Sequence, residues 1–413
     1  MQSGENLGLK KGEMRLAICL SHPIQYKSPL LRRLAKQPGL NMQVYYYSDR
    51  GIVNKKNTYH EVIPAWDIPL LDGYSSEFIP NLVNEEKWNL TFIQPFVNTK
   101  IVPLINAGKF DAIILHSYLY PSDWFAFVTA KIKRVAVLFY GDMYPSGRNS
   151  SIRRLGKSIL SSVMIRGSAA CLAIGSVARQ VFLDEYHIPE ERVFLAPYAV
   201  DNDYFISMNN GCRGERNSIK NRLGIPPVSP VVLCVAGMIS VKRQIDLIDA
   251  MTRLKKLAQL VLVGHGPSMH SVQAYAIKKL PTTIFTGFVN QSELPRYYAA
   301  ADLFVLPSQT EVFGLVVNEA MCASLPVITS NAVAASCDLI REGENGFTFP
   351  PGDVDQLADE IDRLLDDELL RQKFGQRSLE IISGWNLDRT VDGIMAALNY
   401  VAGRKNYDSQ LRK

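Results

Sequence analysis

The sequence alternates short runs of apolar, mostly β-branched residues with segments of amphipathic helical spacing, and this alternation limits the possible folds most. Five such runs lie in the first half of the chain, at 15–21, 42–48, 111–117, 134–141 and 171–176. Five more lie in the second half, at 231–237, 259–264, 283–288, 303–308 and 326–330. Buried strands separated by helices are typical of parallel sheets with crossover helices. We therefore expect an α/β protein with two doubly wound domains.

A polar stretch from Asn209 to Lys220 interrupts the alternation and suggests where the domains divide. The spacing after Trp385 is helical, and we expect this last helix to pack back on the first domain. The predicted division is a disordered N-terminus at 1–13, a first domain at 14–208, a linker at 209–228, a second domain at 229–384 and a C-terminal helical segment at 385–413.

Composition restricts the class of protein. A chain of 413 residues with 47% hydrophobic and 21% charged residues is typical of a globular protein with two domains. The net charge of +5 favours anionic partners only weakly, and we expect no nucleic acid partner. No apolar run approaches the ~20 residues of a membrane span and no signal-peptide core follows the start, so we expect a cytoplasmic protein. The six cysteines include no CxxC pair, which favours buried thiols over zinc or disulfides.

The stretch SQTEVFGLVVNEAMCASLPVITS, at 308–330, is the most informative segment for function. It predicts a loop after a strand, then a helix that Pro326 ends. The N-terminus of such a helix faces the crevice at the carboxyl ends of parallel strands, where ligands of open α/β sheets bind. Free N–H groups there would form a cradle for phosphate or hydroxyl groups, at Phe313, Gly314 and Leu315.

Two carboxylates flank this cradle. Glu311 precedes the helix and Glu319 lies more than one turn inside it, so the two can reach different parts of one extended ligand. Carboxylate oxygens accept hydrogen bonds from sugar hydroxyls. The alternative is structural: Glu311 complements the helix dipole, worth ~0.3–1 kcal/mol, and Glu319 is a solvated helix charge.

The region around this segment, from Glu293 to Ile361, resembles the C-terminal domain of family four retaining glycosyltransferases. So do LVGHGP at 262–267, TGFV at 286–289 and VAGMISVKRQIDLI at 235–248. The opening SHPIQYKSPLLRRLA at 21–35 is similar to that of a bacterial subgroup of the family. The resemblance covers roughly residues 14–400 and implies the GT-B fold, in which two Rossmann-like domains face a central cleft.

The resemblance implies roles for residues of the second domain. Glu319 would hold the ribose hydroxyls of a nucleotide sugar, and Glu311 the sugar hydroxyls beside the reacting carbon. Lys242 would neutralise the diphosphate. The family has an arginine after the glycine that corresponds to Gly237, whereas this chain has Met238, so we expect Arg243 to assist Lys242. The backbone at Phe288 and Val289 would contact the base, while the amides of Phe313, Gly314 and Leu315 would hold the sugar and the distal phosphate.

The resemblance also bears on the first domain. His116, at the end of a predicted strand, matches an active-site histidine that touches the donor sugar, although such a histidine is often structural. His22 and Gln25 follow the first strand, where many relatives have a glycine-rich loop, and are candidates for the acceptor side. Asp142 is a weaker candidate for the same side.

The implied function is hexosyl transfer with retention, from a UDP- or GDP-sugar to a carbohydrate or lipid-linked hydroxyl, in bacterial surface polysaccharide or glycolipid synthesis. We expect no metal and no cofactor. A nucleotide-sugar epimerase of the same fold is the alternative. A dinucleotide oxidoreductase is less consistent, since the first strand leads into SHPIQ rather than GxGxxG. A silent binding module is disfavoured by the presence of Glu311, Glu319 and Lys242.

One basic segment suggests a membrane partner. IRRLGKSILSSVMIRG, at 152–167, combines four basic residues with apolar residues at roughly helical spacing. Such a helix could lie on an anionic surface, which would place the protein peripherally on the inner face of the plasma membrane. The alternative is a surface helix that packs its apolar stripe on the sheet.

Overall fold

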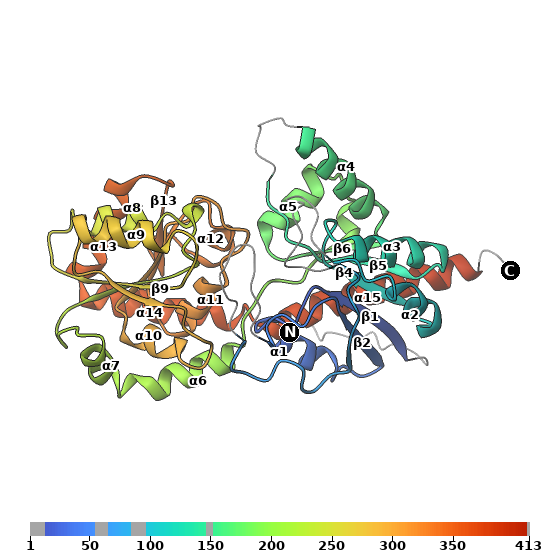
Figure 1. Cartoon of the computed structure of the whole chain (residues 1–413), viewed down its shortest axis with the longest axis horizontal. Coiled ribbons are helices and arrows are strands. Elements are labelled where there is room, and N and C mark those ends of the chain that lie inside the picture. The colour runs from blue at the N-terminus through green and yellow to red at the C-terminus, as the bar shows by residue number, and fades with distance from the viewer. Residues whose placement is uncertain (1–12, 54–64, 84–95, 146–151, 411–413) are drawn as a thin grey trace, which may run out of the picture.

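The computed structural model describes residues 13–53, 65–83, 96–145 and 152–410, without the side chains of 152–157 and 405–410 (Figure 1). All but one residue of the expected disordered N-terminus, 1–13, lie outside these ranges. The chain forms two α/β lobes joined side by side, with the C-terminal helix running back across the first lobe.

The first lobe contains a parallel sheet of seven strands in the order β3-β2-β1-β4-β5-β6-β7. Its strands are β1 Met14–Leu20, β2 Leu40–Tyr46, β3 Ser76–Phe78, β4 Ala112–Leu115, β5 Ala136–Phe139, β6 Ala170–Ala173 and β7 Val193–Leu195. The helices of this lobe are α1 Lys27–Leu34, α2 Ile101–Gly108, α3 Pro121–Ile132, α4 Ile152–Gly167 and α5 Ser176–Asp184, with the short 3-10 helix η2 Glu190–Arg192.

The second lobe contains a parallel sheet of six strands in the order β10-β9-β8-β11-β12-β13. Its strands are β8 Val231–Val235, β9 Gln259–Val263, β10 Ile284–Gly287, β11 Leu303–Leu306, β12 Val327–Ser330 and β13 Gly346–Phe349. The helices are η3 Ser240–Lys242, α8 Gln244–Met251, α9 Met269–Lys279, α10 Leu294–Ala300, α11 Leu315–Cys322, α12 Ala334–Leu339, α13 Val354–Asp366 and α14 Glu368–Ser383. The prediction of two doubly wound parallel sheets is confirmed.

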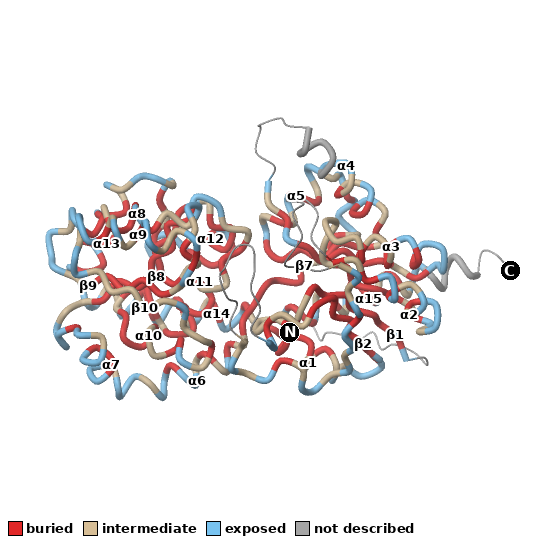
Figure 2. Tube along the Cα trace, in the orientation of Figure 1, coloured by how far each residue is buried: buried red, intermediate tan, exposed pale blue. Residues whose placement is uncertain are grey.

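Apolar side chains cover both faces of the second sheet, as its continuous apolar strands predict. Leu233 belongs to a core cluster that continues into the first lobe, whereas Val232 and Cys234 belong to a separate cluster that includes residues of α8, α9 and α13. Buried residues follow the strands in the interior of both lobes (Figure 2). Successive strand residues face opposite sides, so one strand serves both cores. Each sheet is therefore a buried layer between helices.

The segment predicted as the linker, 209–228, is largely helical. Helices α6 Asn202–Arg213 and α7 Arg216–Arg222 pack on α10 of the second lobe, and α6 also packs on α11. The chain instead crosses between the lobes at 196–201, directly after β7. Polar composition concealed these helices because only one face of each is buried, through residues such as Phe205 and Ile219.

Helix α15 Leu387–Gln410 packs on α1, β6 and β7 of the first lobe. Hydrogen bonds secure its start to the crossing segment: Trp385 Nε1 donates to Tyr198 O at 2.8 Å, and Thr390 Oγ1 donates to Pro197 O at 2.6 Å. Helix α15 passes close to β7 at Gly393, where an added Cβ would lie 1.9 Å from Leu195 O.

Substitution of Gly393 tests this docking. Gly393→Ala should lower the free energy of unfolding by about 1–3 kcal/mol, because the helix must move away from β7. Gly403→Ala is the matched control on the same helix, since a Cβ there meets nothing within 4 Å, and it should be neutral or stabilising. Urea unfolding of both variants measures the difference, and equal stabilities would contradict the close packing.

Candidate functional site

The candidate site lies at the carboxyl ends of the strands of the second sheet, where its strand order reverses between β8 and β11. Loops from neighbouring strands separate at such a switch point and leave a crevice. Lys242 comes from the loop after β8, and Glu311 comes from the loop after β11. The topology therefore brings together two residues that are 69 positions apart in the sequence.

Lys242 and Glu311 form an ion pair between Nζ and Oε2. Both side chains are only 17% exposed, so water screens the pair weakly. An anionic ligand that approaches Lys242 must share its ammonium group with Glu311. The pair places one cation and one acceptor of hydroxyl hydrogen bonds at the same point of the crevice.

The N-terminus of α11 lies beside this pair. Gly314 has φ of 101°, in the left-handed region that other residues rarely adopt, and a Cβ there would lie 3.2 Å from Glu311 Cγ. The N–H groups of Phe313, Gly314 and Leu315 donate no hydrogen bond to another described residue, as is usual for the first turn of a helix. These donors and the helix dipole favour an anion or an oxygen-rich ligand.

Glu319 is deeper, on the same helix, and only 7% exposed. Its Oε2 accepts a hydrogen bond from the Tyr298 hydroxyl at 2.7 Å. Burial raises the pKa of Glu319 to about 7, and the tyrosine hydrogen bond offsets part of that effect. The carboxylate lies at the wall of a cavity of about 260 Å³ between the two lobes.

Gln25 lines the same cavity from the first lobe. Its Oε1 is buried without a hydrogen-bond partner among the described residues, so it is available to a ligand. The structure thus brings Gln25 and Glu319 to one cavity. His22 lies nearby in the chain, and burial beside Arg50 lowers its pKa to about 4, which keeps the imidazole neutral.

His116 directly follows β4, at the switch point of the first sheet. Its Nδ1 lies 2.9 Å from Cys19 O, and a carbonyl can only accept, so the proton is on Nδ1 and Nε2 is left as an acceptor. Burial and the neighbouring Lys27 lower the pKa of His116 well below its usual value. The ring is a neutral group for hydrogen bonding, unsuited to carry charge near pH 7.

Other predicted residues have local partners. Arg243 forms a bidentate pair with Asp246 at the start of α8, so its charge is already compensated. Asp142 accepts a hydrogen bond from the Tyr198 hydroxyl at 2.8 Å. Phe288 contacts Trp66 of the first lobe edge to face, with ring centroids 5.8 Å apart. Gly237 and Val289 follow β8 and β10.

Met238, at the position of the family's arginine, is 1% exposed and packs in the core of the second lobe. The side chain points into this core, while the Met238 backbone passes close to Gly266, whose added Cβ would lie 2.6 Å from Met238 O. Position 238 therefore carries no cation, and the positive charges of this loop are those of Lys242 and Arg243.

Two residues near the site were not singled out by sequence reasoning. Lys27 is buried, without a hydrogen-bond partner for Nζ among the described residues, and lies over the rings of Tyr140 at 4.8 Å and Tyr198 at 5.1 Å. Burial lowers its pKa to about 8. Tyr298, the partner of Glu319, reads in the sequence as an ordinary apolar position of an amphipathic helix. A lysine within an otherwise apolar helix start was the only available signal for Lys27.

No group of three or more histidine, cysteine, aspartate or glutamate side chains within the described ranges is arranged to hold a metal ion. Among the helices of the described part, none is long and apolar enough to cross a membrane.

Part of the chain is similar to known glycosyltransferases. Residues 215–380 match the family model of glycosyl transferases group 1. Sulfoquinovosyl transferase SQD2 of Arabidopsis thaliana is 34% identical over 157 residues, which are 37% of this chain and 30% of that protein. Alpha-D-kanosaminyltransferase of Streptomyces kanamyceticus is 28% identical over 221 residues, 52% of this chain and 55% of that protein. The chain thus spans about a third to a half of these two relatives.

Solved structures are similar over nearly the whole chain. Anabaena HepE in complex with UDP-glucose has a TM-score of 0.72 at 17% identity, covering 94% of this chain and 100% of that one. WaaG, a glycosyltransferase involved in lipopolysaccharide biosynthesis, has a TM-score of 0.67 at 16% identity, covering 92% and 98%. The chain has the GT-B fold.

Proposed function

We propose that this protein is a retaining glycosyltransferase that moves a sugar from a nucleoside-diphosphate sugar to a hydroxyl acceptor. The observation that carries the proposal is the Lys242–Glu311 pair at the N-terminus of α11, at the switch point of the second sheet. The match of residues 215–380 to group 1 glycosyl transferases and the UDP-glucose bound by HepE support it. The acceptor is proposed to be a carbohydrate or lipid-linked hydroxyl of bacterial surface polysaccharide or glycolipid synthesis.

In this proposal the ribose hydroxyls donate to Glu319, and the diphosphate lies between Lys242 and the free amides at 313–315. Glu311 accepts hydrogen bonds from sugar hydroxyls once Lys242 turns to the phosphate. The acceptor enters from the first lobe, past Gln25. Because the cavity beside Glu319 is lined by both lobes, donor and acceptor sides meet there.

The reaction is a substitution at the anomeric carbon. The acceptor oxygen forms a bond to that carbon, while the bond from the carbon to the diphosphate oxygen breaks with its electron pair. The acceptor proton passes to the departing phosphate oxygen on the same face, so the configuration is retained. Lys242 and the helix terminus stabilise the charge that develops on the leaving diphosphate, and His116 Nε2 is an acceptor for a donor-sugar hydroxyl.

Substitutions in the Lys242 loop test the proposal. Lys242→Ala should lower kcat/KM roughly 10- to 150-fold, because a charge-assisted hydrogen bond contributes ~1.5–3 kcal/mol. Arg243→Ala should cost less, since Arg243 is paired with Asp246. Transfer should also survive EDTA, because the leaving charge is neutralised by Lys242 rather than by a metal.

The assay couples candidate nucleotide sugars to lipid-linked and free saccharide acceptors. A full-rate Lys242→Ala enzyme, or activity that only manganese restores, would overturn the assignment of charge. Conversion of the nucleotide sugar in the absence of any acceptor would indicate the epimerase instead.

Donor binding should depend on the ionisation of Glu319. With a pKa of about 7, the carboxylate loses its charge as pH falls, and with it the capacity to accept from two ribose hydroxyls. The Kd of the donor should rise roughly tenfold from pH 8 to pH 6, the range over which the ionised fraction changes by that factor. A nucleotide sugar is the right probe because its diphosphate does not titrate in this range. Glu319→Gln should bind weakly at both values, and a pH dependence that persists in it would refute the assignment.

We also propose that the first lobe binds an anionic membrane surface through α4. Ile159 is 57% and Val163 51% exposed, whereas Ser161, Met164 and Ile165 are buried. The basic residues Arg153, Arg154 and Lys157 of the predicted stripe have side chains outside the described part. Exposed apolar residues one turn apart suit insertion at a lipid interface.

Liposome sedimentation tests the membrane proposal. The protein should sediment with anionic vesicles and not with neutral ones, and the double variant Ile159→Ser/Val163→Ser should lose this binding. Leu369→Ser is the control, because Leu369 is 77% exposed on the second lobe. Equal sedimentation of all three proteins would exclude α4 as the contact.

A further inference from the structure

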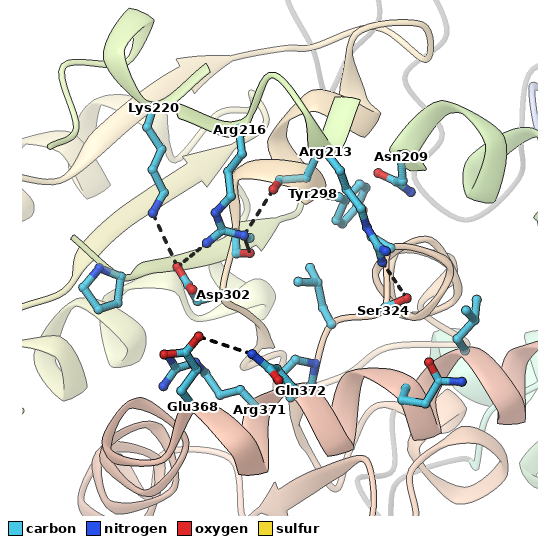
Figure 3. Close-up of a pocket in the computed structure, with 18 of the residues that line it drawn as sticks. Asn209, Arg213, Arg216, Lys220, Tyr298, Asp302, Ser324, Glu368, Arg371 and Gln372 are labelled. Atoms are coloured by element: carbon cyan, nitrogen blue, oxygen red, sulfur yellow. Dashed lines mark hydrogen bonds and ion pairs between the residues drawn. The ribbon is translucent and has the colours of Figure 1, made fainter. Parts of the chain in front are cut away.

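A second large cavity lies in the second lobe, at the opposite end of its sheet from the candidate site. Its lining includes Pro230, Asp302 and Pro326, which directly precede β8, β11 and β12. Its volume is about 720 Å³, within the range of ordinary small-molecule sites. Helices α6 and α7 frame it on one side and α14 on the other (Figure 3).

The cavity carries an excess of positive charge. Four cationic side chains line it, against two carboxylates: Arg213, Arg216, Lys220 and Arg371 against Asp302 and Glu368. A single carboxylate, that of Asp302, serves two of these cations, at 2.7 Å from Arg216 and 3.8 Å from Lys220. Four positive and two negative side chains give this lining a net positive charge that complements a dianion.

Among the cations of the cavity, Arg213 is the one most available to bind a ligand. It is exposed at the end of α6, and its guanidinium donates to Ser324 Oγ at 2.9 Å without an acidic partner among the described residues. Arg371, across the cavity on α14, donates through one nitrogen to Leu364 O and Leu365 O at 2.7 and 2.9 Å. A guanidinium group has five N–H donors, so both arginines retain donors.

A buried amide at the cavity wall has no partner. Asn209 on α6 is 1% exposed and lines the cavity, yet neither its Oδ1 nor its Nδ2 makes a hydrogen bond to a described residue. Leaving such a group unsatisfied costs about 1–3 kcal/mol, and a polar occupant of the cavity would relieve that cost. This observation is independent of the charge and also points to a polar ligand.

We propose that this cavity binds a sugar phosphate. The phosphate accepts hydrogen bonds from the arginines, with Arg213 as its principal partner. The sugar hydroxyl groups bind the polar side chains of α14 that line the cavity, which are Glu368, Gln372 and Gln376. The volume accommodates a phosphorylated hexose with bridging water. A second site for the nucleotide is disfavoured because the described lining offers Tyr298 as its one aromatic ring, and that ring is fully buried in the core.

The cavity is connected to Glu319 through one side chain. Tyr298 on α10 lines the cavity and donates its hydroxyl to Glu319. Helix α6, which carries Asn209 and Arg213, packs on both α10 and α11, the helix of Glu319. A ligand that draws α6 toward α14 therefore changes the support of Glu319, so sugar phosphate and donor affinities are coupled. This coupling rests on the proposed function, whereas the cavity does not.

Calorimetric titration with glucose 6-phosphate tests the site, and unphosphorylated glucose is the ligand control. The wild-type protein should bind the phosphate ester saturably and not glucose. Arg213→Ala should raise the Kd of glucose 6-phosphate on the order of tenfold, because a charge-assisted contact is lost. The isosteric Gln376→Glu should raise it by a similar factor, because the added carboxylate repels the phosphate. Arg222→Ala is the protein control, because Arg222 lies on α7 outside the cavity and pairs with Glu215. Unliganded melting temperatures verify that each variant folds.

The Lys242→Ala variant distinguishes binding in this cavity from binding at the proposed diphosphate site. It should bind glucose 6-phosphate like the wild type. Loss of binding in Lys242→Ala, unchanged binding in both cavity variants, or no saturable binding to the wild-type protein would each overturn the proposal. For the coupling, saturating glucose 6-phosphate should shift the donor Kd of the wild type, and Tyr298→Phe should retain the sugar phosphate but lose that shift. An unchanged donor Kd in the wild type would reject the coupling alone.

Discussion

The direction of the strands is the constraint on which the rest of this structure depends. In each sheet every strand runs parallel to its neighbours, and the order reverses once, between β1 and β4 in the first and between β8 and β11 in the second. Loops must diverge at these points, so polar residues that would be buried elsewhere in a sheet can reach a ligand. His22 and His116 follow β1 and β4, while Lys242 and Glu311 follow β8 and β11. Both sets of candidate residues are thus consequences of topology.

Tyr198 links the two lobes at the point where the chain crosses between them. Its hydroxyl donates to Asp142 of the first lobe, and its carbonyl accepts from Trp385 before α15 and from Asn318 of α11. Its ring lies 6.0 Å from that of Phe313, at the N-terminus of α11. A change in the relative position of the lobes must therefore alter the environment of the same turn that carries the free amides of the site.

In the proposed function, ligand binding at this site is a competition with the charges that are already present there. The Lys242–Glu311 pair is only partly exposed, and Glu319 is buried with a raised pKa. In the proposed function, a diphosphate would offer Lys242 two negative charges in place of one, and sugar hydroxyl groups would replace the lysine at Glu311. Removing one member of such a pair leaves the other uncompensated, so single substitutions report on both residues. We therefore propose that Lys242, Glu311 and Glu319 act together in donor binding rather than as separate contacts.

The sequence by itself determined the alternation of strands and helices, and hence the parallel sheets, because buried apolar runs and amphipathic spacing are local properties. It also determined the helix start at Gly314 and the carboxylates that flank it. Only the tertiary structure decided that α6 and α7 belong to the second lobe, that Met238 points into the core while Arg243 pairs with Asp246, and that Tyr298 supports Glu319. These outcomes depend on contacts between residues that are distant in the chain. A polar sequence is equally compatible with an exposed linker and with a helix that buries one face. The basic cavity, assembled from α6, α7, α10 and α14, left no local pattern for the same reason.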